Sequence, residues 1–165
     1  IVAYDTEPDA VKQYAVDVQA QLDIEVVPVE NPQEAVRGCD IVVTAGPILK
    51  QPHATIKAGW LDEGAFASLV DFDSYWHPDA MAEAAKFCTD DIDQLRLYQQ
   101  MGYFQNIPPL YADLGELATG SKAGRETESE RTITANLGLA LDDMAVAPLI
   151  FARAREKGIG TWLPL

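Results

Sequence analysis

The first five residues, Ile1 to Asp5, have the pattern of a buried strand that ends on a carboxylate. A helical pattern follows from about Pro8 to Leu22, and a second apolar run, Ile24–Val29, comes after it. Strands that alternate with helices predict βαβ crossovers, and therefore a parallel sheet covered by helices on both faces. The alternation assigns the chain to the α/β class.

The alternation continues through the rest of the chain. A short helix is predicted over Pro32–Arg37, with a capping box formed by Asn31 and Glu34 and with Gly38 as its stop. A polar, glycine-bearing loop is expected at Ser121–Arg131. Further strands are predicted at Ile41–Ala45, Ala65–Val70, Phe87–Thr89 and Thr132–Leu137, and further helices at Pro78–Lys86, Asp90–Met101, Pro108–Gly120 and Ala140–Lys157. We expect the last helix to pack across the sheet, with Pro148 kinking or dividing it.

A carboxylate that ends a strand and precedes a helix is also typical of the second strand of a dinucleotide-binding half. In that fold a glycine-rich turn lies about 20 residues before the acid and holds the pyrophosphate, while the acid binds the ribose hydroxyls. No such turn precedes Asp5. We therefore expect a Rossmann-type parallel sheet that lacks its first strand and its glycine-rich loop.

The missing strand is central in the usual strand order, so its neighbours would be left with unpaired edges. We expect the chain to pair its strands differently, to recruit another chain, or to be unstable alone.

The net charge of −14 excludes two classes of partner. Such a charge repels the phosphate backbone of nucleic acids and an anionic membrane surface. No apolar run reaches the roughly 18 residues that a membrane span needs, and the start has no signal-peptide pattern, which favours a cytoplasmic location. Cys39 and Cys88 stand far apart, so neither a disulfide nor a metal site is indicated.

The segment Asp71–Pro78 combines carboxylates, aromatic rings and a histidine directly after a predicted strand. In open α/β sheets, ligands bind at the carboxyl ends of the strands. This loop and Asp5 would both emerge at such ends, so we predict the functional site there.

Six ordered segments of the chain resemble the ornithine cyclodeaminase and mu-crystallin family: YDTEP, CDIVVTAGP, LVDFDSYWHPD, ELATGSKAGRE, RTITANLGLALDD and ARAREKGIGTWLPL. The resemblance implies that residues 1–165 are a partial NAD-binding Rossmann domain, and that the family's substrate-binding and dimerisation domain lies outside them. It also implies an NAD-dependent enzyme, homodimeric when intact. Its substrate would be a small amino acid or cyclic imine, for example L-ornithine, which is converted to L-proline and ammonia.

Two other interpretations stay open. The chain could belong to a non-catalytic dinucleotide-binding protein of the mu-crystallin type, or it could be a fragment with no activity of its own.

The resemblance assigns cofactor contacts to the ends of the first strands. Asp5 matches the ribose-binding acid, and its charge favours NAD over NADP because a 2′-phosphate would meet like charge. An acid in this position could instead cap the helix. Thr44, Ala45 and Gly46 match the strand end that runs along the adenosine and the nicotinamide ribose, where small residues permit close approach of the backbone. The alternative is an ordinary turn.

Asp73 matches the catalytic aspartate of the family, which acts as acid and base and contacts the substrate amine. The alternative is a solvated loop acid or a helix cap. Val70, Asp71 and Phe72 would lie beside the cofactor. The family commonly has two small residues at the last two positions, so the bulky Phe72 must either displace the loop or line the pocket.

Three further residues have weaker assignments. His77 stands where some members place a basic residue near the cofactor, although a histidine here could also cap a helix. Asn136 matches a contact to the nicotinamide amide, for which its side chain has both a donor and an acceptor, and it could equally be an N-cap. Leu137 would lie on the substrate side. Arg125 could hold its loop or face a dimer partner.

Overall fold

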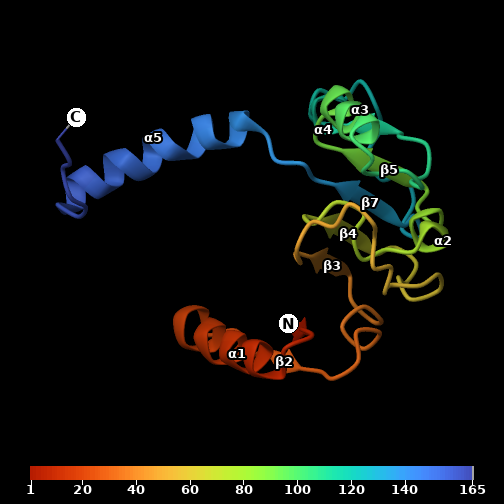
Figure 1. Ribbon diagram of the computed structural model, residues 1–165, viewed down its shortest axis with the longest axis horizontal. Helices are drawn as coiled ribbons and strands as arrows, with labels where there is room; N and C mark the ends of the chain where they lie inside the picture. Colours follow the sequence, from red (N-terminus) through yellow and green to blue (C-terminus); the bar gives the residue numbers. More distant parts are fainter. Residues whose placement is uncertain (165) are drawn as a thin grey trace.

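Residues 1–164, which the computed structural model describes, form two separate parallel sheets (Figure 1). The smaller sheet pairs β1 (Val2–Ala3) with β2 (Val27–Pro28). The larger sheet has the order β3-β4-β7-β5-β6. Its strands are β3 (Ile41–Thr44), β4 (Phe66–Leu69), β5 (Lys86–Thr89), β6 (Ala112–Asp113) and β7 (Thr132–Ala135). The predicted α/β class with a parallel sheet is confirmed.

The last strand, β7, inserts between β4 and β5, which precede it in the chain. Its Ala135 pairs with Leu69 on one side and with Thr89 on the other. Because all five strands are parallel, their carboxyl ends lie at one edge of the sheet. The loops after β4, β5 and β7 therefore leave the sheet side by side.

The expected break in the sheet is present. The two short strands β1 and β2 lie with helix α1 (Pro8–Leu22) below the main sheet in Figure 1 and do not pair with it. The facing edge strand is β3, where Ile41 and Val43 are 65% and 59% exposed. The chain thus carries an apolar, unpaired strand edge at this position.

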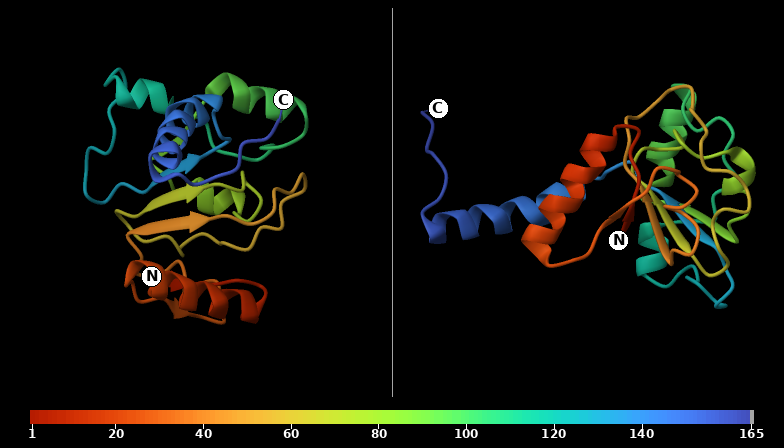
Figure 2. Two further views of the ribbon diagram at one scale, coloured as in Figure 1. Left: turned by 90° about the vertical axis from the view of Figure 1, so that its left-hand side faces the viewer. Right: turned by 90° about the horizontal axis from the view of Figure 1, so that it is seen from below.

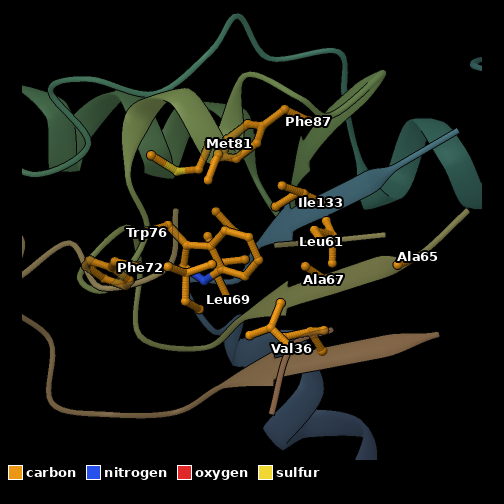
Figure 3. Close-up of a cluster of buried hydrophobic side chains, with 14 of the residues drawn as sticks. Val36, Leu61, Ala65, Ala67, Leu69, Phe72, Trp76, Met81, Phe87 and Ile133 are labelled. Atoms are coloured by element: carbon orange, nitrogen blue, oxygen red, sulfur yellow. The ribbon is translucent and has the colours of Figure 1, made fainter. Parts of the chain in front are cut away.

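The core lies on one face of the larger sheet (Figure 3). Alternate residues of the strands point to this face, as the period of two requires. Helices α2 (Pro78–Met81) and α3 (Ile92–Gln100) and the loop before β4 supply the opposing side chains. Trp76 is 1% exposed at the centre of this cluster. Its largest fully buried members are Trp76, Phe87, Phe104, Leu61, Leu69, Met81, Leu95 and Ile133.

The predicted helix at Pro32–Arg37 is wrong, since this segment forms consecutive turns. Asn31 accepts hydrogen bonds from the backbone N–H of Gln33 through its side chain and from that of Glu34 through its carbonyl. Gly38 then closes the segment in the left-handed region, with φ +72°. So short a stretch gains few helical hydrogen bonds against the cost of nucleation.

The helix predicted at Pro108–Gly120 is correct only in its second half. Residues 108–111 form neither helix nor strand, β6 follows at Ala112–Asp113, and the helix α4 runs over Leu114–Ala118. Adjacent prolines disfavour helical backbone at the start of the segment. Asp113 and Glu116 form a capping box that fixes the later start.

Helix α5 (Ala140–Lys157) has the predicted bounds and ends at Gly158 in the left-handed region, but it does not pack across the sheet. It extends away from the rest of the chain, as Figure 1 and Figure 2 show, and none of its residues is buried. It also continues through Pro148 rather than dividing there. Its apolar spacing predicts a helix but cannot specify which surface the apolar side chains will meet. None of the helices among residues 1–164 is long and apolar enough to span a membrane.

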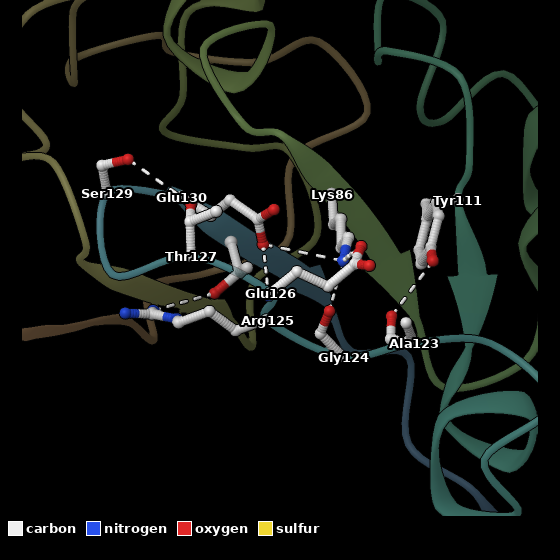
Figure 4. Close-up of polar contacts among 10 residues, drawn as sticks. Lys86, Tyr111, Ala123, Gly124, Arg125, Glu126, Thr127, Ser129 and Glu130 are labelled. Carbon is white, nitrogen blue, oxygen red and sulfur yellow. Dashed lines mark hydrogen bonds and ion pairs between the residues drawn. The ribbon is translucent and has the colours of Figure 1, made fainter.

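The loop at Ser121–Arg131 is fastened to the amino edge of the sheet by a buried lysine (Figure 4). The side chain of Lys86 is 8% exposed and its Nζ lies 2.6 Å from Glu126 Oε2 and 3.6 Å from Glu130 Oε2. It also donates to the carbonyl of Gly124. Arg125 holds the same loop, since its guanidinium donates to the Gly64 carbonyl and to Thr132 Oγ1.

We predict that Lys86→Met lowers the melting temperature, because it leaves two glutamates and a carbonyl without their shared donor. Hydrogen bonding to Glu126 raises the pKa of Lys86, and a backbone hydrogen bond from Glu126 lowers the pKa of Glu130. The contribution of Lys86 to stability is therefore lost at alkaline pH. The contribution of Glu130 to stability is lost at acid pH. The melting temperatures of wild type and variant should differ most between about pH 5 and pH 10, the range between the ordinary pKa values of glutamate and lysine.

The control is Arg96→Met, which removes an exposed ion pair of 3.3 Å with Asp93. Exposed pairs of this kind contribute little, so this variant should melt like the wild type. Equal melting temperatures for the Lys86 and Arg96 variants would contradict the prediction.

Candidate functional site

Asp71 joins the loops that follow β3 and β4. Its side chain is fully buried, and its two oxygens accept hydrogen bonds from Thr44 Oγ1 at 2.7 Å and from the backbone N–H of Gly46 at 3.0 Å. Trp76 Nε1 donates to the same threonine oxygen at 3.2 Å. Burial raises the pKa of Asp71, and the hydrogen bonds from Gly46 and Thr44 partly offset that rise. The carboxyl group thus faces protein groups, so its role is to hold the loop after β3.

Tyr75 packs against that loop, and its ring explains why residue 46 is a glycine. Its hydroxyl donates to the Pro47 carbonyl at 3.1 Å, and a Cβ added at Gly46 would lie 2.5 Å from its ring. Ser74 adds a further link, since its Oγ accepts from the backbone N–H of Leu49 at 2.9 Å. The small residue that the sequence attributes to close approach of a cofactor is thus already required by the tyrosine. Ala45 and Gly46 stay exposed at the strand end.

One of the two alternatives from the sequence, that Phe72 lines the pocket, is wrong. Phe72 is 4% exposed and its ring packs against Tyr98, Tyr103 and Phe104, with centroid distances of 5.0, 5.6 and 4.8 Å. Its φ of 63° is a conformation that glycine adopts readily and a bulky residue adopts only with strain. The aromatic packing offsets that strain, and the backbone of the loop keeps the shape that a small residue would give it.

Asp73 is a buried carboxyl with an unused oxygen. It is 3% exposed, and within residues 1–164 its Oδ1 is the one buried side-chain polar atom without a hydrogen-bond partner. Burial raises the pKa of Asp73; nearby backbone N–H groups, including that of Phe104, oppose the rise and the carboxyl of Asp71 adds to it. Its burial rules out a solvated loop acid. Buried polar atoms are almost always paired, so an unpaired one marks a position where a ligand could supply the partner.

A pocket of about 210 Å³ lies at the carboxyl ends of β4, β5 and β7. It brings together residues that are far apart in the sequence. Three of them, Val70, Asn136 and Leu137, are among the site residues that the sequence predicts. Its walls are formed by Val70, Asp90, Leu114, Asn136, Leu137, Gly138 and Asp142. A wider and more open depression of about 470 Å³ lies beside α3, but it is lined by arginine and glutamine side chains away from the strand ends. We therefore place the candidate site at the smaller pocket.

Asn136 is not the N-cap of α5, because Leu139 occupies that position. Its Nδ2 donates to Ser68 Oγ at 2.8 Å, and its Oδ1 accepts from Thr134 Oγ1 at 3.1 Å. These bonds tie the side chain to the neighbouring strand β4 and leave one amide hydrogen and one lone pair for another partner.

The remaining predicted residues have local contacts. Asp5 lies in the connection between β1 and α1, where its Oδ1 accepts from the backbone N–H of Glu7 at 2.8 Å. His77 occupies the N-cap position of α2 without a side-chain capping bond. Within residues 1–164, no group of three or more histidine, cysteine or acidic side chains is arranged to hold a metal ion.

Sequence reasoning missed two residues of this region. The sequence pattern places Tyr75 only among the aromatic residues of the loop after a predicted strand, and Asp90 only at the start of a predicted helix. Asp90 in fact follows β5 directly and lines the pocket. A carboxylate at the end of a predicted strand is the same signal that singled out Asp5 and Asp71, and it could have identified Asp90 as well.

We predict that Gly46→Ala destabilises the chain by about 1 kcal/mol, the usual contribution of one hydrogen bond. The new methyl group must displace the Tyr75 ring, whose hydroxyl then loses the Pro47 carbonyl. In a Tyr75→Ala background the same substitution should cost almost nothing, because the obstructing ring is gone. Urea unfolding of the four proteins of this cycle measures the coupling.

Gly124→Ala is the matched control, since nothing lies within 4 Å of its added Cβ and its φ is not positive. If Gly46→Ala were equally costly with and without the tyrosine, the proposed contact would be excluded.

The chain matches the model of the ornithine cyclodeaminase/mu-crystallin family over residues 1–158. A curated relative, the N-((2S)-2-amino-2-carboxyethyl)-L-glutamate dehydrogenase of Staphylococcus aureus, is 30% identical over all of this chain and half of its own length. The chain spans about half the length of the curated relatives it matches.

Two solved structures are similar to the whole chain. The Thermococcus litoralis Δ1-pyrroline-2-carboxylate reductase in complex with NADH and L-proline has a TM-score of 0.77 and 27% identity over 98% of this chain and 52% of its own. An archaeal alanine dehydrogenase dimer with bound NAD has a TM-score of 0.74 and 26% identity over 99% and 52%. By its ordered motifs, its fold and its match over residues 1–158, the chain belongs to the ornithine cyclodeaminase/mu-crystallin family.

Proposed function

We propose that this chain is the NAD-binding part of an enzyme that interconverts an amino acid and its imine, with Asp73 as the acid–base residue. The observation that carries the proposal is the unpaired Oδ1 of Asp73 in a position that is 3% exposed. A buried carboxyl with an unused oxygen is suited to accept a hydrogen bond from a substrate nitrogen and to move a proton there. The named activities of the relatives, alanine dehydrogenase and pyrroline-2-carboxylate reductase, are of this reaction class.

The pocket residues fit one end of the dinucleotide. Its apolar walls, Val70, Leu114 and Leu137, suit a flat ring, and Asn136 keeps one donor and one acceptor for a carboxamide. The exposed backbone of Ala45 and Gly46 would run along the ribose next to it. The carboxylate of Asp5 would bind the hydroxyls of the other ribose through Oδ2, since its Oδ1 already accepts from the backbone N–H of Glu7 and from Thr6 Oγ1.

The dinucleotide, when bound, supplies a hydride acceptor or donor. The protein must then place the substrate carbon near that ring and handle the proton on the substrate nitrogen. The apolar side chains of Val70 and Leu137 would lie against the ring, and Asp73 would take or return the proton. Ornithine cyclodeamination is one chemistry of this kind. Oxidation at Cα would give an imine, the δ-amino group would attack it, ammonia would leave, and return of the hydride to the cyclic imine would give L-proline. A homodimer is the expected assembly of the intact protein.

The test uses the natural full-length polypeptide that carries this sequence. NADH binding is measured by fluorescence, and turnover is followed as NADH oxidation or NAD reduction with a panel of substrates. The panel contains Δ1-pyrroline-2-carboxylate, pyruvate with ammonia, L-alanine, L-proline and L-ornithine, and products are identified by NMR. Asp73→Asn should bind NADH as well as wild type but lose turnover by about 100-fold or more, the usual range for general acid–base residues. Asp93→Asn, which changes an exposed acid on α3, is the control.

The outcomes separate the alternatives. Proline with equimolar ammonia from L-ornithine would identify a cyclodeaminase, and turnover of an imine alone would identify a reductase. NADH binding without turnover of any substrate would favour a non-catalytic dinucleotide-binding protein. Full activity of Asp73→Asn would remove Asp73 from the mechanism.

A second prediction concerns stability. Burial raises the pKa of Asp73, so ionising it weakens the fold, and stability falls as the pH rises from the ordinary aspartate pKa through the raised one. Asp73→Asn does not ionise, so it should gain stability relative to wild type at pH 8. The gain should shrink as the pH falls, because the wild-type carboxyl then becomes neutral. Urea unfolding at about pH 3.5, below the ordinary aspartate pKa, and at pH 8 measures it. A gain that is equal at both would contradict the assignment.

A further inference from the structure

Asp90 makes four hydrogen bonds at the end of β5. Its Oδ2 accepts from the backbone N–H groups of Leu137 and Gly138, both at 2.7 Å. Its Oδ1 accepts from its neighbours Asp91 N at 3.1 Å and Thr89 Oγ1 at 3.2 Å. The residue is 8% exposed. Both oxygens are thus occupied by protein donors, and two of these donors belong to the loop that follows β7.

That loop has few other supports. The last ladder bond of β7 runs from Asn136 N to the Leu69 carbonyl, one residue before the two N–H groups that Asp90 binds. Gln94 donates to the Gly138 carbonyl at 3.3 Å. Helix α5, which follows the loop, has no buried residue that could pack against it. Gly138 has φ +86°, a conformation that the adjacent carboxylate stabilises by binding its N–H.

The same loop forms one wall of the pocket, through Asn136, Leu137 and Gly138. We infer that Asp90 is a positioning residue, which holds this loop in the shape that accepts the nicotinamide end of the cofactor. The inference rests on the proposed function, since it assigns the pocket to the dinucleotide. Asp90 itself acts only through the loop, because its oxygens are already used.

The experiment compares neighbouring aspartates in the natural full-length polypeptide. Asp90→Ala removes the acceptor for both loop N–H groups. Asp91→Ala removes the N-cap of α3, whose Oδ1 accepts from Gln94 N at 2.6 Å, and should lower the melting temperature by about 2–4 °C. If the Asp90 variant holds the binding-competent loop about one tenth of the time, its dissociation constant for NADH rises about tenfold. The Asp91 variant should bind NADH within twofold of wild type.

Asp90→Asn provides the rescue. Its amide oxygen can still accept from Leu137 and Gly138, while its NH₂ group meets the N–H of Asp91, so its affinity for NADH should lie between those of wild type and the alanine variant. Amide hydrogen exchange gives a readout that needs no cofactor. Leu137 and Gly138 should lose protection in Asp90→Ala and keep it in Asp91→Ala.

The results distinguish this inference from the proposed function. Wild type that fails to bind NADH would overturn both the cofactor assignment and the role of Asp90 in binding it, while hydrogen exchange would still report whether Asp90 holds the loop. NADH binding that is unchanged in Asp90→Ala, with a melting temperature lowered as in Asp91→Ala, would reduce Asp90 to a structural residue and overturn the inference alone.

Discussion

The backbone pairing of β7 with β4 and β5 is the contact on which the rest of the structure depends. The strand is the last one within residues 1–164, yet it occupies the centre of the larger sheet and joins two pairs of strands that precede it. Without it, the end of β4 and the end of β5 would have no common neighbour. Because β7 is parallel to both, its end brings Leu137 beside Val70 and Asp90. The pocket is a direct product of this strand order.

Three carboxylates at this edge of the sheet have different surroundings and therefore different roles. Asp71 and Asp90 accept hydrogen bonds from loop N–H and hydroxyl groups, and each fixes a neighbouring loop. Asp73 keeps a buried oxygen without a partner. In the proposed mechanism, the fixed loops would supply the rigidity that the reacting carboxyl of Asp73 needs, since a catalytic carboxyl is useful only when its neighbours hold it in place. Residue type alone does not separate these roles; their hydrogen-bond partners do.

The sequence predicts local structure well where spacing and capping act over a few residues. The bounds of α1 and α5 and the positions of β3, β4 and β7 follow from such signals. It fails where the deciding contact is distant. The inward turn of Phe72 depends on rings some 30 residues away, and the need for Gly46 depends on Tyr75. The path of α5 away from the sheet is of the same kind, because periodicity defines an apolar face without defining its partner.

The two edges of the sheet divide stability and function between them. At the amino edge, Lys86 is surrounded by acceptors that it satisfies, and the loop it binds has no role in the pocket. At the carboxyl edge, the structure tolerates the strained φ of Phe72 and the unpaired oxygen of Asp73. Both features cost stability, and the aromatic packing of Phe72 offsets only the first of them. Such costs concentrate where binding or chemistry requires them, which is the physical reason to seek the function of this chain at that edge.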